Sequence, residues 1–229
     1  MTTSTFILVP GAGGDAFYWH RVVPLLRDAG HEAVAVDLPA GDDRAGLAEY
    51  ADLIAGAIGD RSGVVLVAQS MGAYSAPLAC TRANVVRMVL VAPMIPAPGE
   101  TASEFWSATG QGAAARALAE REGRDPDAPF DIQEGFFHDV PPDVVARVLA
   151  RGAPGDSATP FEQPWPLDAW PDVPTSVIAG ARDRLFPLDY VRRLARERLG
   201  IDEVAVVDAG HLPALSRPEE LVRLLLPAA

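Results

Sequence analysis

The sequence is poor in cysteine, in positive charge and in long apolar runs. Its single cysteine, Cys80, excludes an internal disulfide framework. Its 19 lysines and arginines are outnumbered by 31 aspartates and glutamates, which gives a net charge of −12. Because so acidic a surface repels phosphate backbones, we expect no nucleic-acid partner. No apolar run reaches the roughly 20 residues that a membrane-spanning helix needs, so we expect no membrane partner.

Signals for targeting, cofactors and metals are also missing. The opening MTTSTFILVPGAGG (1–14) passes from a short polar lead into an apolar run without a basic region, so we expect a cytoplasmic protein. The glycine-rich stretch at 10–14 lacks the G-K-[ST] of a phosphate-binding loop. His20, His31 and His138 lack the spaced partners that are typical of metal sites. We therefore expect neither a cofactor nor a metal.

Short apolar runs alternate with segments of helical spacing along most of the chain. We predict strands at 5–9, 31–39, 63–69, 85–94, 174–183 and 202–211, and helices at 19–30, 47–59, 71–82, 188–200 and 216–226. Ser216 followed by Glu219 is a capping-box pattern that marks the start of the last helix. The alternation predicts an α/β fold in which helices cover both faces of a mostly parallel sheet.

The alternation breaks between residues 97 and 168. This segment combines short helical pieces with many prolines and several aromatic residues. We predict that residues 97–168 form a small, mainly helical cap on a core made of residues 1–96 and 169–229. Within the segment, Trp106 and Phe136 are candidates to line a substrate pocket, and the alternative is that they form the interior of the cap.

Polar residues lie at or directly after the carboxyl ends of the predicted strands, the edge of the sheet where α/β proteins bind their ligands. They include Ser70, Asp183 and His211, in this chain order. A serine hydroxyl becomes a strong nucleophile when a base takes its proton, and an acid orients that base. In VLVAQSMGAYSAPLA (64–78), a sharp strand-to-helix turn would lift Ser70 clear of the sheet. Asp208 is the competing acid, and we expect it to face away from His211.

A serine nucleophile also needs backbone donors for the oxyanion that forms during the reaction. We expect one donor to be the amide of Met71, directly after Ser70. The stretch PGAGG after the first predicted strand exposes its backbone, and we expect the second donor to be the amide of Ala12.

Four stretches resemble the α/β-hydrolase superfamily, and the first resembles its branch of plant methyl-ester esterases and hydroxynitrile lyases. They are VPGAGGDAFYWHRVVPLLRDAGHEAVAVDLPA (9–40), AQSMGA (68–73), VIAGARDRLFP (177–187) and DAGHLPAL (208–215). The resemblance implies the α/β-hydrolase fold and the triad and oxyanion hole named above, and it does not extend to the predicted cap. The chain departs from the family at Pro10, where histidine is usual, and at Gln69, where histidine is frequent. We expect Gln69 to affect packing only.

The function predicted from these residues is hydrolysis of a carboxylic ester of a small, partly hydrophobic substrate through an acyl-enzyme. Lactone and thioester hydrolysis are variants of the same chemistry. Cyanohydrin-cleaving lyases of this branch carry a hydroxyl residue and a lysine at the positions of Ala12 and Leu212, which disfavours that alternative. A non-catalytic small-molecule binder that retains the triad stays open, and the sequence predicts no oligomeric state.

Overall fold

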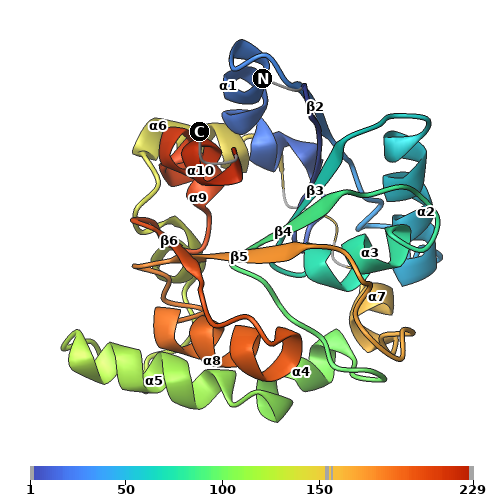
Figure 1. The fold of residues 1–229 in the computed structure, drawn as a ribbon. Helices are drawn as coiled ribbons and strands as arrows, with labels where there is room; N and C mark the ends of the chain where they lie inside the picture. Colours follow the sequence, from blue (N-terminus) through green and yellow to red (C-terminus); the bar gives the residue numbers. More distant parts are fainter. Residues whose placement is uncertain (1–2, 153–154, 156, 227–229) are drawn as a thin grey trace.

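A six-stranded sheet forms the centre of the computed structural model, which describes residues 3–152, 155 and 157–226 (Figure 1). The strands are β1 (Thr5–Val9), β2 (Glu32–Ala35), β3 (Val64–Gln69), β4 (Arg87–Val91), β5 (Thr175–Gly180) and β6 (Ala205–Val207). Their order is β2-β1-β3-β4-β5-β6, and every neighbouring pair is parallel. Residues 1–2 and 227–229 of the predicted core, and residues 153–154 and 156 of the predicted cap, lie outside the described residues.

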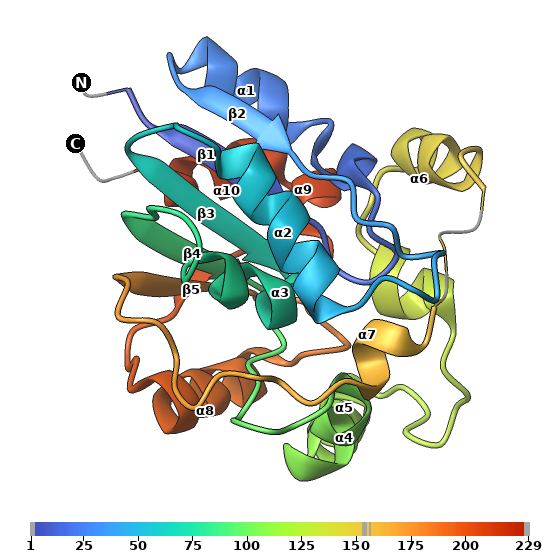
Figure 2. The same ribbon diagram turned by 90° about the vertical axis from the view of Figure 1, so that its right-hand side faces the viewer.

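Helices cover both faces of this sheet, as Figure 2 shows, which confirms the predicted architecture. One face carries α2 (Leu47–Ile58), α3 (Gly72–Ala79) and α8 (Leu188–Leu199), and the other carries α1 (Val22–Asp28) and α10 (Pro218–Leu225). Within β1, Ile7 and Val9 pack on the first face and Phe6 and Leu8 on the second. Successive strand residues point to opposite faces, so a sheet covered on both sides requires the continuous apolar strands seen in the sequence.

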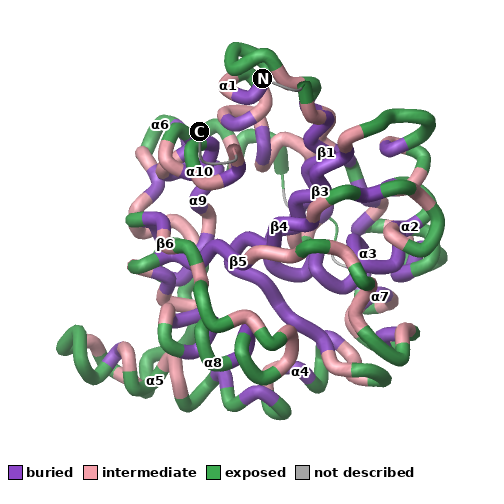
Figure 3. Tube along the Cα trace, in the orientation of Figure 1, coloured by how far each residue is buried: buried purple, intermediate pink, exposed green. Residues whose placement is uncertain are grey.

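The chain between β4 and β5 leaves the sheet and returns. It contains α4 (Ala102–Ala108), α5 (Gln111–Arg121), the π-helical turn η2 (Gln133–Phe137), α6 (Pro142–Leu149) and α7 (Thr159–Glu162). Figure 3 shows that α5 is largely exposed, whereas the central strands β1, β3 and β4 are largely buried. After α7, the segment contacts the core again, because Gln163 Oε1 accepts a hydrogen bond of 2.7 Å from the amide of Leu47 at the start of α2.

Two predicted helices begin later in the structure than the sequence suggested. Residues 16–19 form a 3₁₀ turn, η1 (Ala16–Trp19), and α1 begins only at Val22. The capping box at Ser216 is wrong, because residues 213–216 form a separate helical turn, α9 (Pro213–Ser216). The Ser216 hydroxyl donates to the carbonyl of Leu212. The last helix instead starts at Pro218, whose fixed φ suits a first helical turn.

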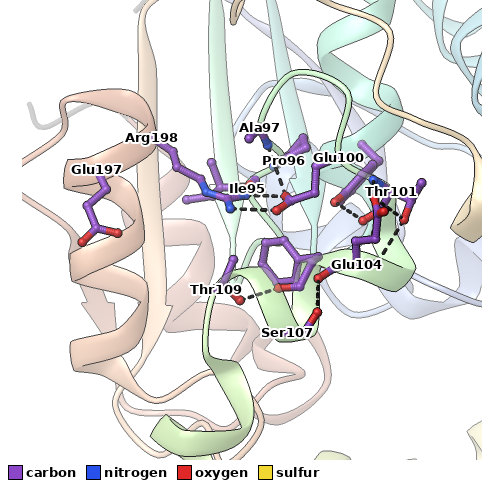
Figure 4. Close-up of polar contacts among 12 residues, drawn as sticks. Ile95, Pro96, Ala97, Glu100, Thr101, Glu104, Ser107, Thr109, Glu197 and Arg198 are labelled. Atoms are coloured by element: carbon purple, nitrogen blue, oxygen red, sulfur yellow. Dashed lines mark hydrogen bonds and ion pairs between the residues drawn. The ribbon is translucent and has the colours of Figure 1, made fainter.

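A shielded ion pair ties the beginning of the β4–β5 segment to α8 (Figure 4). Arg198 Nη2 donates to Glu100 Oε1 at 2.9 Å, and Nη1 of the same guanidinium contacts Glu100 Oε2 and donates to the carbonyl of Ile95. The Arg198 and Glu100 side chains are 16% and 9% exposed. Since a shielded charge that loses its partner is costly, removing one side chain of this pair should lower stability more than breaking a surface ion pair does.

Glu100→Ala is therefore expected to lower the free energy of unfolding by about 3 kcal/mol. This value is the lower end of the cost of removing one partner from a buried ion pair, because both side chains keep some exposure. In a protein of this size, that loss lowers the melting temperature by roughly 6–12 °C, measurable by thermal circular dichroism. The matched control is Glu197→Ala, which removes the exposed ion pair with Arg193 on the same helix and should cost less than about 1 kcal/mol. Equal melting temperatures for the two variants contradict this account.

Candidate active site

Ser70 lies on a strained turn between β3 and α3. Its φ of +48° is in the left-handed region, which residues with a side chain rarely adopt. Two hydrogen bonds hold this conformation, because the Ser70 amide donates to the carbonyl of Val91 at 3.0 Å and the amide of Met94 donates to the carbonyl of Ser70 at 3.1 Å. Backbone strain of this kind persists where the surrounding structure enforces it, and it is concentrated at functional sites.

The loop after β1 lies directly against this turn, and two glycines make that approach possible. A Cβ at Gly72 would lie 2.6 Å from the carbonyl oxygen of Pro10. A Cβ at Gly11 would lie 2.3 Å from Gln69 Oε1 and 3.0 Å from the Cβ of Ser70. Any side chain at either position would therefore push the loop away from the serine.

The structure brings Ser70, His211 and Asp183 together in one hydrogen-bonded chain. His211 Nε2 lies 3.1 Å from Ser70 Oγ, and His211 Nδ1 lies 2.8 Å from Asp183 Oδ2. The three residues are only 9%, 1% and 1% exposed, respectively. With its Nδ1–H directed to the carboxylate, the imidazole presents Nε2 as an acceptor for the serine hydroxyl.

Asp183 is held in place by the backbone that follows it. Its Oδ1 accepts hydrogen bonds of 2.8 Å from the amides of both Leu185 and Phe186, which leaves Oδ2 for His211. Asp208 is instead at the surface, with a side chain that is 68% exposed and paired with Arg182. Of the two candidate acids, Asp183 is therefore the one that contacts His211.

Aromatic rings enclose the imidazole of His211. The ring of Phe186 meets it edge-on with centroids 5.0 Å apart, and the ring of Phe136 lies at 5.4 Å. Phe186 is fully buried and was not singled out from the sequence, although it lies in the stretch that carries Asp183. Such apolar surroundings exclude water and strengthen the interactions among the polar groups they enclose.

Two further side chains bind the backbone of the loop that carries His211, residues 208–212, called here the histidine loop. Gln69 Nε2 donates to the carbonyl of His211 at 3.3 Å, so its expected role in packing alone is incomplete. Asp139 Oδ2 accepts a hydrogen bond of 2.8 Å from the amide of Gly210. No sequence pattern pointed to Asp139, because its partner lies 71 residues away along the chain.

The two expected oxyanion donors flank the serine. Met71 directly follows it and is buried, and Ala12 is exposed on the loop that Gly11 brings against the turn. Within the described residues, neither amide takes part in a backbone hydrogen bond outside regular helices and strands. An oxyanion hole requires amides that are not already bound within the protein.

Two cavities are lined by residues close to the triad, and the described lining of neither includes Ser70, Asp183 or His211. The larger, of about 700 Å³, is lined by Trp106, Phe136 and Leu185 among others. The smaller, of about 190 Å³, lies beside the loop after β1 and is lined by Ala12, Tyr18, Gln69, Phe137 and Leu212 among others. Burial raises the pKa of Tyr18 above its usual range, so its hydroxyl stays neutral. No sequence pattern pointed to Tyr18 or Phe137 as pocket residues.

Among the residues that the structure describes, no group of three or more histidine, cysteine, aspartate or glutamate side chains is arranged to hold a metal ion. None of the described helices combines the length and the apolar character needed to cross a bilayer.

Comparison with known proteins agrees with this geometry. The model of a family described as alpha/beta hydrolase family matches residues 6–224. Methylesterase 7 of Arabidopsis thaliana is 26% identical over 253 residues, covering 98% of this chain and 95% of that protein. The structure of polyneuridine aldehyde esterase superposes with a TM-score of 0.73 at 21% identity, covering 98% of both chains. A pyrethroid hydrolase from Sphingobium faniae gives a TM-score of 0.73 at 23% identity, covering 98% of this chain and 96% of that one. These matches confirm the predicted fold and the resemblance to esterases.

Proposed function

This chain belongs to the alpha/beta hydrolase family, and from that premise we propose that it hydrolyses carboxylic esters with Ser70 as the nucleophile. The observation that carries the proposal is the buried chain of hydrogen bonds from Ser70 through His211 to Asp183, at the end of a strained strand-to-helix turn. The esterase relatives support the reaction type.

The first half of the reaction forms an acyl-enzyme. His211 Nε2 takes the proton of Ser70 as Oγ attacks the carbonyl carbon, and the amides of Ala12 and Met71 donate to the resulting oxyanion. Asp183 stabilises the imidazolium that forms. The intermediate collapses when the C–O bond to the alcohol breaks and His211 returns the proton to the leaving oxygen.

In the second half, water replaces the alcohol. His211 takes a proton from the water, whose oxygen attacks the acyl carbon, and collapse of this second intermediate restores the Ser70 hydroxyl and releases the acid. No step requires a cofactor. The substrate is proposed to be a small, partly hydrophobic ester, and the cytoplasmic location expected from the sequence is part of the same proposal.

The direct test is turnover of p-nitrophenyl esters of acids from acetate to octanoate, followed as release of p-nitrophenolate. The proposal predicts multiple turnovers per chain with saturable kinetics. A non-catalytic binder with the same three residues would bind these compounds without releasing product above the rate of the buffer.

Trp106 and Phe136 are proposed to determine which esters fit, because both line the larger cavity and Phe136 also contacts His211. Phe136→Ala and Trp106→Ala are expected to shift the ranking of kcat/KM toward bulkier esters, since each enlarges the same space. The matched control is Trp170→Ala, which removes a half-buried aromatic that packs on Trp165. If all three variants lower the melting temperature and leave the ester ranking unchanged, the two aromatics serve only to pack the segment.

A further inference from the structure

We propose that Asp139 is a positioning residue for His211, so that the β4–β5 segment helps to orient the catalytic base. This inference rests on the proposed function, because it concerns the histidine that activates Ser70. Asp139 follows η2 and precedes α6, within the segment that the sequence predicts to be a cap. Its carboxylate bonds directly to the histidine loop.

The contact with the loop is short and closely fitted. The Asp139 side chain is only 2% exposed, and its Oδ2 accepts from the amide of Gly210, directly before His211, at 2.8 Å. A Cβ at Gly210 would lie 2.7 Å from Asp139 Oδ1 and 2.8 Å from Cε1 of His138. The absence of a side chain at Gly210 therefore lets the carboxylate reach this backbone amide.

The buried carboxylate of Asp139 has few other hydrogen-bond or ion-pair partners, which argues against a purely stabilising role. Its Oδ1 is buried and has no hydrogen-bond partner among the described residues. The guanidinium Nη2 of Arg182 lies 4.0 Å from Asp139 Oδ2, and the Arg182 side chain is 41% exposed. A buried carboxylate with so few partners costs stability, whereas an ionised acceptor makes a stronger bond to an amide than a neutral one does.

The segment around Asp139 is itself anchored on the histidine loop. Val140 and Val144 form an apolar cluster with Leu215 of α9, and the partly buried Phe137 and Leu212 pack against it. Figure 1 shows α6 beside α9, in agreement with this cluster. These apolar contacts hold the chain around Asp139 against Leu212 and Leu215, which follow His211 in the sequence.

Asp139 and Gln69 consequently bind backbone groups of two successive residues of the histidine loop. Asp139 binds the amide of Gly210 before the histidine, and Gln69 binds the carbonyl of His211 itself. The imidazole must keep Nε2 on Ser70 and Nδ1 on Asp183 at the same time, so a small rotation of the loop would disturb both contacts. A misplacement of about 1 Å can cost on the order of 10²-fold in rate.

The test compares Asp139→Ala, Asp139→Asn and wild type, with kcat expressed per active site titrated by a fluorophosphonate ester. Asp139→Ala is expected to lower kcat by about 10–100-fold while KM stays within about 3-fold, because the orientation of the base is lost and the pocket is not. Asp139→Asn keeps an acceptor for Gly210 and is expected to recover most of the loss. Titration makes the result independent of the folded fraction.

The matched control is Gln163→Ala. Gln163 belongs to the same segment, and its side chain also accepts a hydrogen bond from an amide of the core, that of Leu47. It should leave kcat per titrated site within about 2-fold of wild type, since general loosening of the segment does not reach the base. Equal losses of kcat in Asp139→Ala and Gln163→Ala, or no loss in Asp139→Ala, overturn the inference. If Asp139→Ala yields no folded protein, Asp139→Ser takes its place, because the serine hydroxyl is one bond too short to reach the Gly210 amide. A kcat at least about 10-fold below that of Asp139→Asn supports the inference, and a smaller difference overturns it. Failure of the proposed function would appear separately, as ester turnover that survives Ser70→Ala.

Discussion

Ser70→Ala is expected to lower ester turnover by several decades, on the order of 10⁶-fold if the three residues act as a unit, as they do in serine proteases. The variant lacks the oxygen that forms the acyl-enzyme, and His211 then has no hydroxyl to activate. The remaining rate comes from binding and from the oxyanion donors alone. The measurement is kcat for a p-nitrophenyl ester, with circular dichroism to confirm that the fold is unchanged.

The control for this variant is another buried serine close by. Ser75 lies in α3, is 1% exposed and donates to the carbonyl of Gly72. Ser75→Ala removes one hydrogen bond and should cost about 1 kcal/mol of stability without a large change in kcat. Near-native turnover in a folded Ser70→Ala variant, or equal losses in the two variants, contradicts the assignment of Ser70 as nucleophile.

Asp183→Asn is expected to lower kcat by roughly 10⁴-fold, the loss known for the equivalent change in a serine protease. The amide that replaces the carboxylate disfavours the histidine tautomer with a proton on Nδ1, and it does not stabilise the imidazolium. The amides of Leu185 and Phe186 can still be bound by the side-chain oxygen of asparagine, so the local fold should survive.

Asp208→Asn is the matched control, because it makes the same chemical change at the competing acid. Asp208 is 68% exposed and paired with Arg182, and the loss of such a surface contact costs less than about 1 kcal/mol. Turnover by Asp208→Asn should stay within about 2-fold of wild type. The reverse ranking of the two variants is incompatible with Asp183 as the triad acid.

The fold and the arrangement of the three site residues could be predicted because both follow from local patterns. Apolar runs and helical spacing predict parallel strands, and parallel strands bring their carboxyl ends to one edge of the sheet. Ser70, Asp183 and His211 each follow a strand in the sequence, so their proximity follows from the topology alone. The choice between Asp183 and Asp208 rested on chain order, and the structure places Asp183 against His211.

The extent of the last strand was overestimated for a physical reason. Only three residues of the predicted strand at 202–211 pair in the sheet, and they form β6 (Ala205–Val207). This strand lies at the edge of the sheet, so β5 is its single neighbour. Beyond Val207 the chain leaves the sheet, and its backbone binds Arg182 and Asp139 instead of another strand. Periodicity cannot distinguish a buried loop of this kind from a strand.

Contacts between distant segments could not be predicted from one sequence. The bond from Asp139 to Gly210 joins residues 71 positions apart, and the bond from Gln163 to Leu47 joins residues 116 apart. Nothing in the residues around Asp139 distinguishes it from the exposed acidic residues that are abundant in this chain. Its role emerges only when its burial and its partner are known.

The central claim is that Ser70 is a nucleophile activated by His211, and covalent labelling tests it most directly. The protein is treated with a fluorophosphonate ester, in which attack by the serine oxygen displaces fluoride and leaves a phosphonyl group on the enzyme. Mass spectrometry of the intact and digested protein should show one added phosphonyl group per chain, located on Ser70. The label should be absent from Ser70→Ala and much slower to form in His211→Ala. A label on another residue, or equal labelling of the Ser70→Ala variant, would contradict the account.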